Sequence, residues 1–229
     1  MHLEWGAEGL RESARLAGTV VVVDVLSFST AVTVGVERGA TVYPHTAADE
    51  YAAKMAERLG AHLAGSRRDH FSLSPASMAT LAPGDRVVLP SPNGARLCSL
   101  AADTGATVVL GCLRNASALA SWLRTRDGRV VVVAAGEQWR NGAFRVAVED
   151  LLGAGAIFAS LDSDWLSAEA LVAAGAFQAA RSRLATILAE CTSGRELVAR
   201  AFPQDPPWAA DLDSSDAIPV LRSGAFRRL

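Results

Sequence analysis

The chain has little cysteine, few aromatic residues, almost no net charge and no long apolar run. Its cysteines, Cys98, Cys112 and Cys191, form no Cys-x-x-Cys pair, which argues against a disulfide framework and a zinc site. With 6% aromatic residues and a formal charge of −2, we expect no nucleic-acid partner. No apolar run approaches ~18 residues, and no basic start leads into an apolar core. We therefore expect a soluble, cytoplasmic protein that does not insert into membranes.

Several common catalytic motifs are also missing. The sequence has no G-x-S-x-G elbow, no Walker loop and no G-x-G-x-x-G after a strand, which leaves a nucleotide-binding Rossmann module as a weak alternative. The histidines show no metal-ligand spacing, so we assign no zinc or iron site. A haloacid-dehalogenase nucleophile requires a second Asp two residues after the first, and Leu26 stands there after Asp24.

Short apolar strands alternate with helices through the first two thirds of the chain. Residues 19–26 are rich in Val without polar alternation, which indicates a strand buried on both faces. We expect further strands and helices, with strands at 41–43, 86–89, 107–110 and 129–135 and helices at 30–38, 46–59, 95–102 and 116–123. This alternation predicts an α/β fold of three layers, α/β/α, around a mainly parallel sheet, with a mixed sheet as the variant.

We expect a single domain over residues 1–229, with a mainly helical C-terminal part from about residue 145. The helices predicted there span 146–160 and 167–190, and a capping box at Ser193 begins another. The Pro- and Asp-rich segment 203–219 should lie over the domain surface. Residues 65–84 form a long loop, and long loops in compact domains are often functional.

Two segments of the sequence resemble each other. The segment that ends in Gly39-Ala-Thr-Val and the segment that ends in Gly105-Ala-Thr-Val share a strand–helix–Gly plan of similar length. A duplicated half-domain would explain this similarity, and a shared α/β composition is the alternative explanation.

Polar residues stand where several predicted strands end. Asp24 closes the first strand, Asn93 and Asn115 follow two others, and Glu137 follows Gly136 after the fourth. If those strands are parallel, their polar ends meet at one edge of the sheet, where open α/β sheets bind ligands. A carboxylate at a buried strand end is costly and is usually kept for chemistry, so we interpret Asp24 as a metal ligand or acid–base group. The alternative is that Asp24 only caps the next helix.

The turn Ser91-Pro-Asn-Gly-Ala-Arg96 joins a strand to a helix. Backbone N–H groups after Asn93 and Gly94 suit an anion such as phosphate, and Arg96 can add a two-pronged contact to its oxygens. The alternative is a plain turn with a solvated Arg96. Asn115 is equally well explained as a helix cap, and we keep it as a minor binding candidate.

Acidic and basic residues elsewhere complete the candidate site. Glu149 and Asp150 are adjacent at the start of an apolar helix, and we expect one of them in the site and the other in solvent. Oxygen ligands of this kind favour Mg²⁺, although a helix N-terminus enriched in acids is the structural alternative. Arg67 and Arg68 in the long loop are placed to clamp a phosphate or sulfonate, although exposed arginines are common in loops.

Taken in order, these motifs resemble those of the 2-phosphosulfolactate phosphatase (ComB-type) family. The matching segments are Val-Val-Asp24-Val-Leu, Pro92-Asn-Gly-Ala-Arg96, Asn115-Ala-Ser-Ala and Glu149-Asp-Leu-Leu-Gly-Ala-Gly155. The resemblance covers residues 18–161, with a weaker echo at 211–219. It implies a three-layer α/β/α fold and Mg²⁺-dependent hydrolysis of a phosphate ester on a small acid that carries sulfonate and carboxylate groups. The site residues that follow from it are Asp24 and Arg96 for catalysis, Arg67, Asn93, Gly94 and Asn115 for the substrate, and Asp24, Glu149 and Asp150 for the metal.

The sequence departs from the family pattern at several polar positions. Ser27-Phe28 replaces Arg-Ala, Ser66 replaces a Glu, and Leu73 replaces an Asn. Our first hypothesis is a Mg²⁺-dependent phosphatase that hydrolyses a small phosphorylated acid like 2-phosphosulfolactate, which need not be phosphosulfolactate itself. The second is a non-catalytic relative that binds an anionic metabolite or a protein partner. The oligomeric state stays open, with a homodimer as one option.

Overall fold

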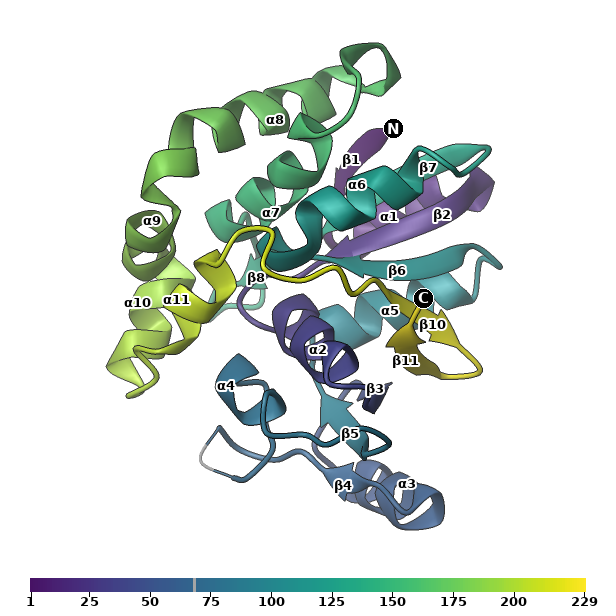
Figure 1. The fold of residues 1–229 in the computed structure, drawn as a ribbon, viewed down its shortest axis with the longest axis vertical. Coiled ribbons are helices and arrows are strands. Elements are labelled where there is room, and N and C mark those ends of the chain that lie inside the picture. The colour runs from purple at the N-terminus through teal and green to yellow at the C-terminus, as the bar shows by residue number, and fades with distance from the viewer. Residues whose placement is uncertain (68) are drawn as a thin grey trace.

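The computed structural model describes residues 1–67 and 69–229, apart from the side chain of Leu16. A nine-stranded sheet forms its centre (Figure 1). In their order across the sheet, the strands are β1 (His2–Trp5), β7 (Arg129–Ala134), β2 (Ala17–Val23), β6 (Thr107–Gly111), β10 (Pro219–Arg222), β11 (Ala225–Arg228), β3 (Thr41–His45), β5 (Arg86–Pro90) and β4 (His62–Leu63). A separate antiparallel pair consists of β8 (Glu137–Gln138) and β9 (Phe144–Arg145).

The sheet is mixed but mostly parallel. Strands β1, β7, β2 and β6 pair in parallel, and so do β3, β5 and β4. The C-terminal hairpin β10–β11 lies between these two groups and pairs antiparallel with β6 on one side and with β3 on the other. The last residues of the chain therefore join the two parallel halves of the sheet.

Helices cover both faces of the sheet, which confirms the predicted three-layer α/β fold. They are α1 (Gly6–Ser13), α2 (Phe28–Glu37), α3 (Glu50–Leu59), α4 (Pro75–Met78), α5 (Gly94–Ala102), α6 (Ala116–Leu123), α7 (Val148–Ala159), α8 (Ala168–Ala180), α9 (Leu184–Glu190), α10 (Thr192–Ala199) and α11 (Asp205–Ala210). Short 3-10 turns span Ala14–Leu16, Leu113–Asn115, Ser163–Trp165 and Arg181–Arg183.

Strand β2 is buried on both faces, which explains why its sequence does not alternate between polar and apolar residues. Val21 and Val23 pack into the core under α6, α7 and α8, whereas Val20 and Val22 pack into the core under α2 and α5. All four side chains are completely buried. A strand covered on both faces is apolar throughout, as is typical of parallel sheets between helices.

Most predicted elements are confirmed, with corrections at their ends. The first strand stops at Val23, before Asp24, because the N–H groups of Asp24 and Val25 donate to the side chains of Ser29 and Asp150. The predicted helix 167–190 is broken by the 3-10 turn Arg181–Arg183.

Other corrections concern the ends of helices and the first residues. Helix α10 begins after Cys191, whose sulfur accepts the N–H of Gly194, so the capping box predicted at Ser193 is wrong. The long loop contains the short helix α4. Sequence patterns identified neither β1 nor α1.

The two similar segments of the sequence occupy equivalent positions. One is β2–α2–β3 with Gly39 before its last strand, and the other is β5–α5–β6 with Gly105. Both glycines have left-handed backbones, with φ of 83° and 80°. The first unit begins in the group that contains β2 and β6 and ends in the group that contains β3 and β5, and the second unit runs the other way. The first strand of each unit therefore pairs with the last strand of the other, β2 with β6 and β5 with β3. The starts of α2 and α5 meet, and this arrangement is the one a duplicated half-domain would give.

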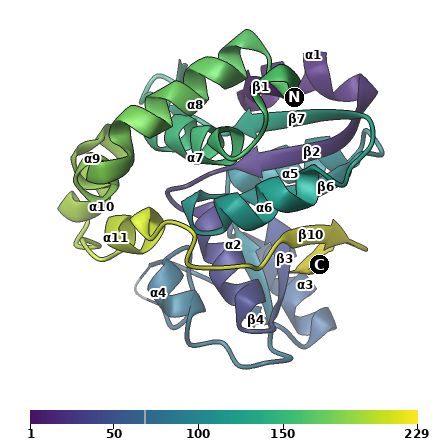
Figure 2. The ribbon, with the colours of Figure 1, turned by 45° about the horizontal axis from the view of Figure 1, so that its top comes forward.

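The C-terminal tail lies on the outside of the molecule. After α11, the tail runs beside the start of α6 before it reaches β10 (Figure 2). At the start of α6, Ser117 donates its N–H and its hydroxyl to the carboxylate of Asp213 in the tail.

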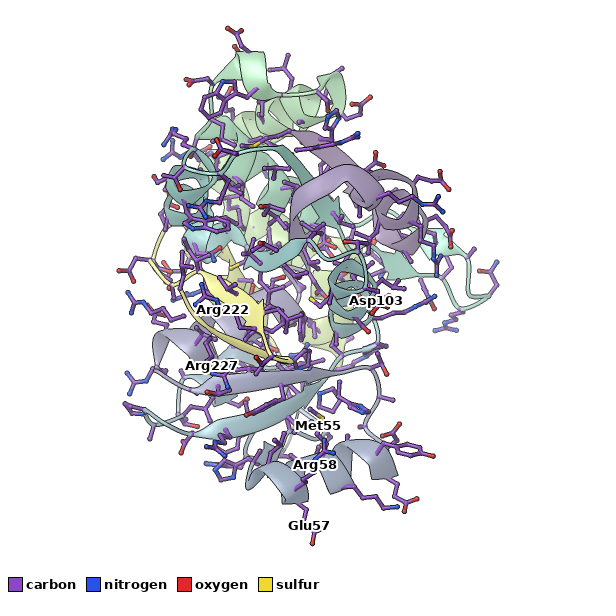
Figure 3. All side chains as sticks on the ribbon, turned by 90° about the vertical axis from the view of Figure 1, so that its right-hand side faces the viewer. Met55, Glu57, Arg58, Asp103, Arg222 and Arg227 are labelled. Carbon is purple, nitrogen blue, oxygen red and sulfur yellow. The ribbon has the colours of Figure 1, made fainter. Side chains whose placement is uncertain are left out.

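On α3, Met55 points toward the strands, while Glu57 points away from the molecule (Figure 3). Among the described residues, no helix combines the length and apolarity needed to cross a membrane.

Candidate active site

A polar cleft of about 240 Å³ lies where β2, β5 and β7 end, beneath α10. Acidic, basic and hydroxyl side chains from widely separated parts of the sequence face it. The lining residues are Asp24, Leu26, Ser27, Phe28, Arg67, Leu73, Ser91, Pro92, Asn93, Glu137, Ser193, Glu196, Leu197 and Arg200. The cleft thus contains Asp24, Arg67 and Asn93 from the sequence-based set.

Asp24 is the most deeply placed acid of the cleft, with 7% of its surface exposed. Its Oδ1 accepts the N–H of Phe28 at 3.2 Å, and its carboxylate also accepts the N–H of Gly94. Burial, reinforced by the charge of Glu137, raises the pKa of Asp24 to about 7. The carboxyl group therefore changes its protonation near neutral pH, and it caps α2 as well.

Gly94 brings the start of α5 against Asp24. A Cβ atom at this position would lie 2.3 Å from Phe28 Cδ1 and 2.8 Å from Asp24 Oδ2. The Phe28 ring is completely buried and packs edge-on against Phe226 at 6.2 Å between ring centroids. The ring has no room to retreat, so the approach of the helix to the carboxylate requires glycine.

Glu149 and Asp150 are both buried, with 2% and 3% exposure, so the expectation that one of them faces solvent is wrong. Asp150 Oδ1 accepts the N–H of Val25 at 2.8 Å, and Oδ2 accepts the N–H of Gly136 at 2.9 Å. It thereby joins the ends of β2 and β7. Burial and the charges of Asp24 and Glu149 raise the pKa of Asp150 well above its usual range.

Glu137 forms the opposite side of the cleft. Asn93 Nδ2 donates to its Oε2 at 2.9 Å. Burial raises the pKa of Glu137, although the Asn93 hydrogen bond and the charge of Arg145 oppose this shift. The acidic groups Asp24, Glu137 and Glu149 lie close enough to perturb one another, since the charges of both glutamates contribute to the raised pKa of Asp24.

Arg67 supplies a positive charge to the cleft and is held on two sides. Its guanidinium pairs with the fully buried Asp205 and donates to Ser27 Oγ at 2.6 Å. Asp205 in turn accepts the hydroxyl of Ser74 at 2.6 Å. Arg68, the other cation of the sequence-based clamp, lies outside the described residues.

The structure adds residues that sequence patterns did not single out. Arg200 and Glu196 line the cleft from the end of α10. Behind them, Arg145 donates to Glu196 at 3.3 Å and to Ser193 at 3.4 Å, and lies over the Trp139 ring at 5.3 Å. Arg145 is buried, and its Nε finds no hydrogen-bond partner within the described part of the chain. In the sequence, Arg145 could have been identified only by its position next to the predicted helix that carries Glu149 and Asp150.

Two sequence-based candidates lie away from the cleft. Arg96 lines an adjoining hollow instead. Asn115 is completely buried: its Oδ1 accepts the N–H of Cys112, and its Nδ2 donates to the carbonyls of Leu110 and Ala217. Those bonds tie the end of β6 to the C-terminal tail, so the amide has no free group to offer a substrate.

The structure explains the departures from the family pattern at Ser27 and Phe28. Ser27 accepts a hydrogen bond from Arg67, so the cleft retains a guanidinium beside this position although the residue itself is not Arg. Phe28 fills the core between Gly94 and Phe226. The cleft therefore still has charges of both signs, although the Arg of the family pattern is missing at Ser27.

The acids are of the type that binds a hard divalent ion, because all donors are oxygen. Among residues 1–67 and 69–229, however, no three His, Cys, Asp or Glu side chains are arranged as ligands of one ion. Both Asp150 oxygens already accept backbone N–H groups. Of the three acids whose charges act on one another here, Asp24 and Glu137 line the cleft, whereas Glu149 does not.

Comparison with known proteins gives a consistent result. A family model described as 2-phosphosulpholactate phosphatase matches residues 7–224. A 2-phosphosulfolactate phosphatase from Methanothermobacter thermautotrophicus is 31% identical over 214 residues, covering 91% of this chain and 88% of the relative. A probable 2-phosphosulfolactate phosphatase from Caldanaerobacter subterraneus subsp. tengcongensis is 28% identical over 224 residues, covering 91% and 89%. The chain therefore belongs to the 2-phosphosulfolactate phosphatase family of phosphoric monoester hydrolases.

Proposed function

We propose that the protein is a Mg²⁺-dependent phosphatase that hydrolyses the phosphate ester of a small acid related to 2-phosphosulfolactate. The observation that carries this proposal is the meeting of the buried Asp24, the start of α5 and the guanidinium of Arg67 at one cleft. Buried acids opposite fixed positive groups are what phosphoryl transfer needs, because charge builds on the phosphoryl oxygens and on the leaving oxygen.

The positive groups of the cleft would hold the anionic parts of the substrate. Arg67 is anchored by Asp205 and Ser27, so its guanidinium is oriented before a ligand arrives. Arg200 lies on the same side and near enough for its charge to act on Arg67. In the first turn of α5, the N–H of Gly94 already binds Asp24, whereas those of Ala95 and Arg96 have no partner within the helix and suit a phosphate oxygen.

The ligands of a Mg²⁺ ion would be drawn from the carboxylates of Asp24, Glu149 and Glu137, although no three acids are gathered as one ligand set in the described part of the chain. The raised pKa of Asp24 arises from burial and from like charges around it, and a cation beside these groups would relieve that repulsion. When bound, such an ion neutralises phosphoryl oxygens and lowers the pKa of a coordinated water. Asp150 contributes by fixing the ends of β2 and β7 on either side of the cleft.

The reaction cleaves the P–O bond of the ester. Water provides the OH that joins phosphorus, and its remaining proton goes to the leaving alkoxide, which departs as an alcohol. With a pKa of about 7, Asp24 is suited to hold or release a proton at this centre at neutral pH. The Asn93 amide orients Glu137 through its hydrogen bond.

Phosphate release tests the proposal directly. The purified chain is assayed with 2-phosphosulfolactate and 2-phospholactate, in the presence of Mg²⁺ and after treatment with EDTA. We expect turnover with Mg²⁺, loss of turnover with EDTA, and at least a ~1000-fold loss in Asp24→Ala. Equal phosphate release by wild type and Asp24→Ala would reject the assignment of the cleft as the catalytic site.

A second candidate function is binding of an anionic metabolite without hydrolysis. It is favoured by the replacements at Ser27 and Ser66, which remove charged groups that the family pattern carries. A rise in the unfolding temperature with sulfolactate, without release of phosphate from any phospho-acid, would support this candidate. Absence of any thermal shift would count against it.

A further inference from the structure

A second hollow adjoins the cleft and has a different chemical character. Its volume is about 360 Å³, compared with about 240 Å³ for the cleft. Pro92, Asn93 and Glu137 line both, so the Asn93–Glu137 hydrogen bond stands at their common boundary. The remaining lining consists of Trp5, Gly6, Ala7, Glu8, Arg96, Leu97, Ala135, Gly136, Gln138, Gly142 and Phe144.

An aromatic wall encloses this hollow on one side. The Phe144 ring meets Trp5 edge-on, with 6.2 Å between centroids, yet 48% of Phe144 remains exposed. Gly6 and Gly136 lie under the ring, and a Cβ atom on Gly136 would come within 2.4 Å of it. Both glycines have positive φ, at 59° and 65°, so the backbone there also disfavours side chains. The ring is therefore held in position while about half of the residue stays exposed.

The floor of the hollow is apolar and its remaining groups are polar. Leu97 and Ala135 are buried core residues that reach it, while Arg96, Glu8 and Gln138 add polar atoms. Pockets for small organic ligands combine an apolar lining with a few polar groups in this way, and they start at about 300 Å³. Glu8 is exposed and pairs with Arg11, so it does not neutralise Arg96, whose guanidinium can stack on a flat ring.

The small acid of the family does not account for this hollow. 2-Phosphosulfolactate carries phosphate, sulfonate and carboxylate on a short carbon chain, so it offers almost no apolar surface to Trp5 and Phe144. The cleft provides two cations, Arg67 and Arg200, for such groups. A phosphate placed there would leave the aromatic hollow free for the other end of a longer ester.

We infer that the hollow binds a flat apolar group on the alcohol side of the substrate, so that this chain, besides the small acids proposed above, takes aryl or similarly apolar phosphate monoesters and turns them over with a higher kcat/KM. The inference rests on the proposed phosphatase function, because the phosphate would occupy the cleft. The chemistry is unchanged: water supplies the OH to phosphorus and a proton to the leaving phenol or alcohol.

To test this inference, kcat/KM of the full chain is measured in the presence of Mg²⁺ with 2-naphthyl phosphate and with 2-phospholactate. In wild type we expect kcat/KM to be at least about tenfold higher for the aryl ester. Phe144→Ala should lower kcat/KM for 2-naphthyl phosphate about tenfold and leave that for 2-phospholactate within about twofold. Tyr51→Ala, which removes an exposed aromatic ring on α3, is the matched control and should change neither.

A second variant and a binding measurement keep the test decisive. Ala7→Leu fills the hollow without removing the aromatic wall, and should cause the same selective loss. Turnover of 2-phospholactate without preference for the aryl ester, or equal losses for both esters in Phe144→Ala and Ala7→Leu, would overturn the inference. If neither ester is hydrolysed, calorimetry with 2-naphthyl phosphate decides: binding that Ala7→Leu abolishes supports the hollow as a site, and no binding to wild type refutes it.

Discussion

Asn93 Nδ2 donates a hydrogen bond of 2.9 Å to Glu137 Oε2 between two hollows that both residues line. Asn93 follows β5 in one parallel group of strands, and Glu137 follows β7 in the other. The bond therefore connects the two halves of the sheet at the point where the substrate is proposed to bind. It also opposes the rise in the pKa of Glu137 that burial causes.

Replacing this donor with an acid should change the pH dependence of activity. In Asn93→Asp, two carboxylates face each other, so the pKa of Glu137 rises further and Glu137 is protonated at a higher pH. We expect kcat/KM at neutral pH to fall about tenfold, with the acid limb of the pH–rate profile moved to higher pH. Asn141→Asp is the control, since Asn141 Oδ1 accepts the N–H of Ala143 and Asp preserves that acceptor. An unchanged acid limb in Asn93→Asp would contradict the role of this contact.

A methyl group at Gly94 should disrupt the catalytic end of α5. Gly94→Ala places its Cβ against the buried Phe28 ring and Asp24, and such overpacking costs about 1–3 kcal/mol. Activity should fall at least about tenfold, because Asp24 loses its contact with the helix start. In contrast, a Cβ at Gly175 in α8 meets nothing within 4 Å, so Gly175→Ala should stabilise the protein by up to about 1 kcal/mol. Urea denaturation measures both changes, and equal stabilities of the two variants would argue against a tight contact at Gly94.

The sequence predicted the layers of the fold because β2 and its neighbours are apolar on both faces, which only a sheet between helices explains. It did not predict the insertion of β10–β11 between β6 and β3. Each of these strands is only four residues long and makes a single registered pair with its parallel-group neighbour. Tertiary contacts rather than a local pattern therefore determine where the hairpin lies.

The candidate site was predictable where a polar residue follows an apolar strand, as at Asp24 and Asn93. This rule failed for Asn115, whose bonds hold the C-terminal tail to β6. Asp205 and Arg200 escaped prediction because they come from helices whose position over the sheet edge has no signature in the sequence. Arg96 has the predicted position at the start of α5 but faces the adjoining hollow.

The raised pKa of Asp24 makes a testable link between pH and stability without metal. Its folded-state pKa of about 7 lies above the ordinary 3.8, so the folded protein binds more protons than the unfolded chain between these values. Stability should therefore fall as pH rises through this window and level off above it. Asp24→Asn removes this proton linkage, so between about pH 4 and pH 8 in EDTA the stability of wild type should fall by about 2 kcal/mol more than that of the inactive variant. Addition of Mg²⁺ at pH 8 should stabilise wild type but not the variant, and an equal fall in stability for both proteins in EDTA would contradict this account.

The same substitution at Asp150 should destabilise the protein through lost hydrogen bonds. Both oxygens of Asp150 accept backbone N–H groups, from Val25 and Gly136. An Asn side chain offers one acceptor and turns an NH₂ group toward the other N–H, which leaves a buried donor unpaired. We expect Asp150→Asn to lower the free energy of unfolding by about 1–3 kcal/mol. Thermal unfolding of Asp24→Asn and Asp150→Asn at the same pH separates the two roles, and stabilisation by both substitutions would show that Asp150 does not anchor the strand ends.

Asp205 should control substrate affinity through Arg67, although it does not line the cleft itself. Its carboxylate accepts from the Arg67 guanidinium and from the Ser74 hydroxyl, and an amide can serve only one of these donors well. In Asp205→Asn, Arg67 loses its counter-charge but keeps its contacts with Ser27 and the Phe202 ring, so we expect KM for a phospho-acid to rise about fivefold with a smaller change in kcat. Asp216→Asn breaks the exposed Arg228–Asp216 pair and is the matched control, with an expected stability change below about 0.5 kcal/mol and unchanged kinetics. A fall in kcat at constant KM in Asp205→Asn would instead show that this network acts on the chemical step rather than on binding.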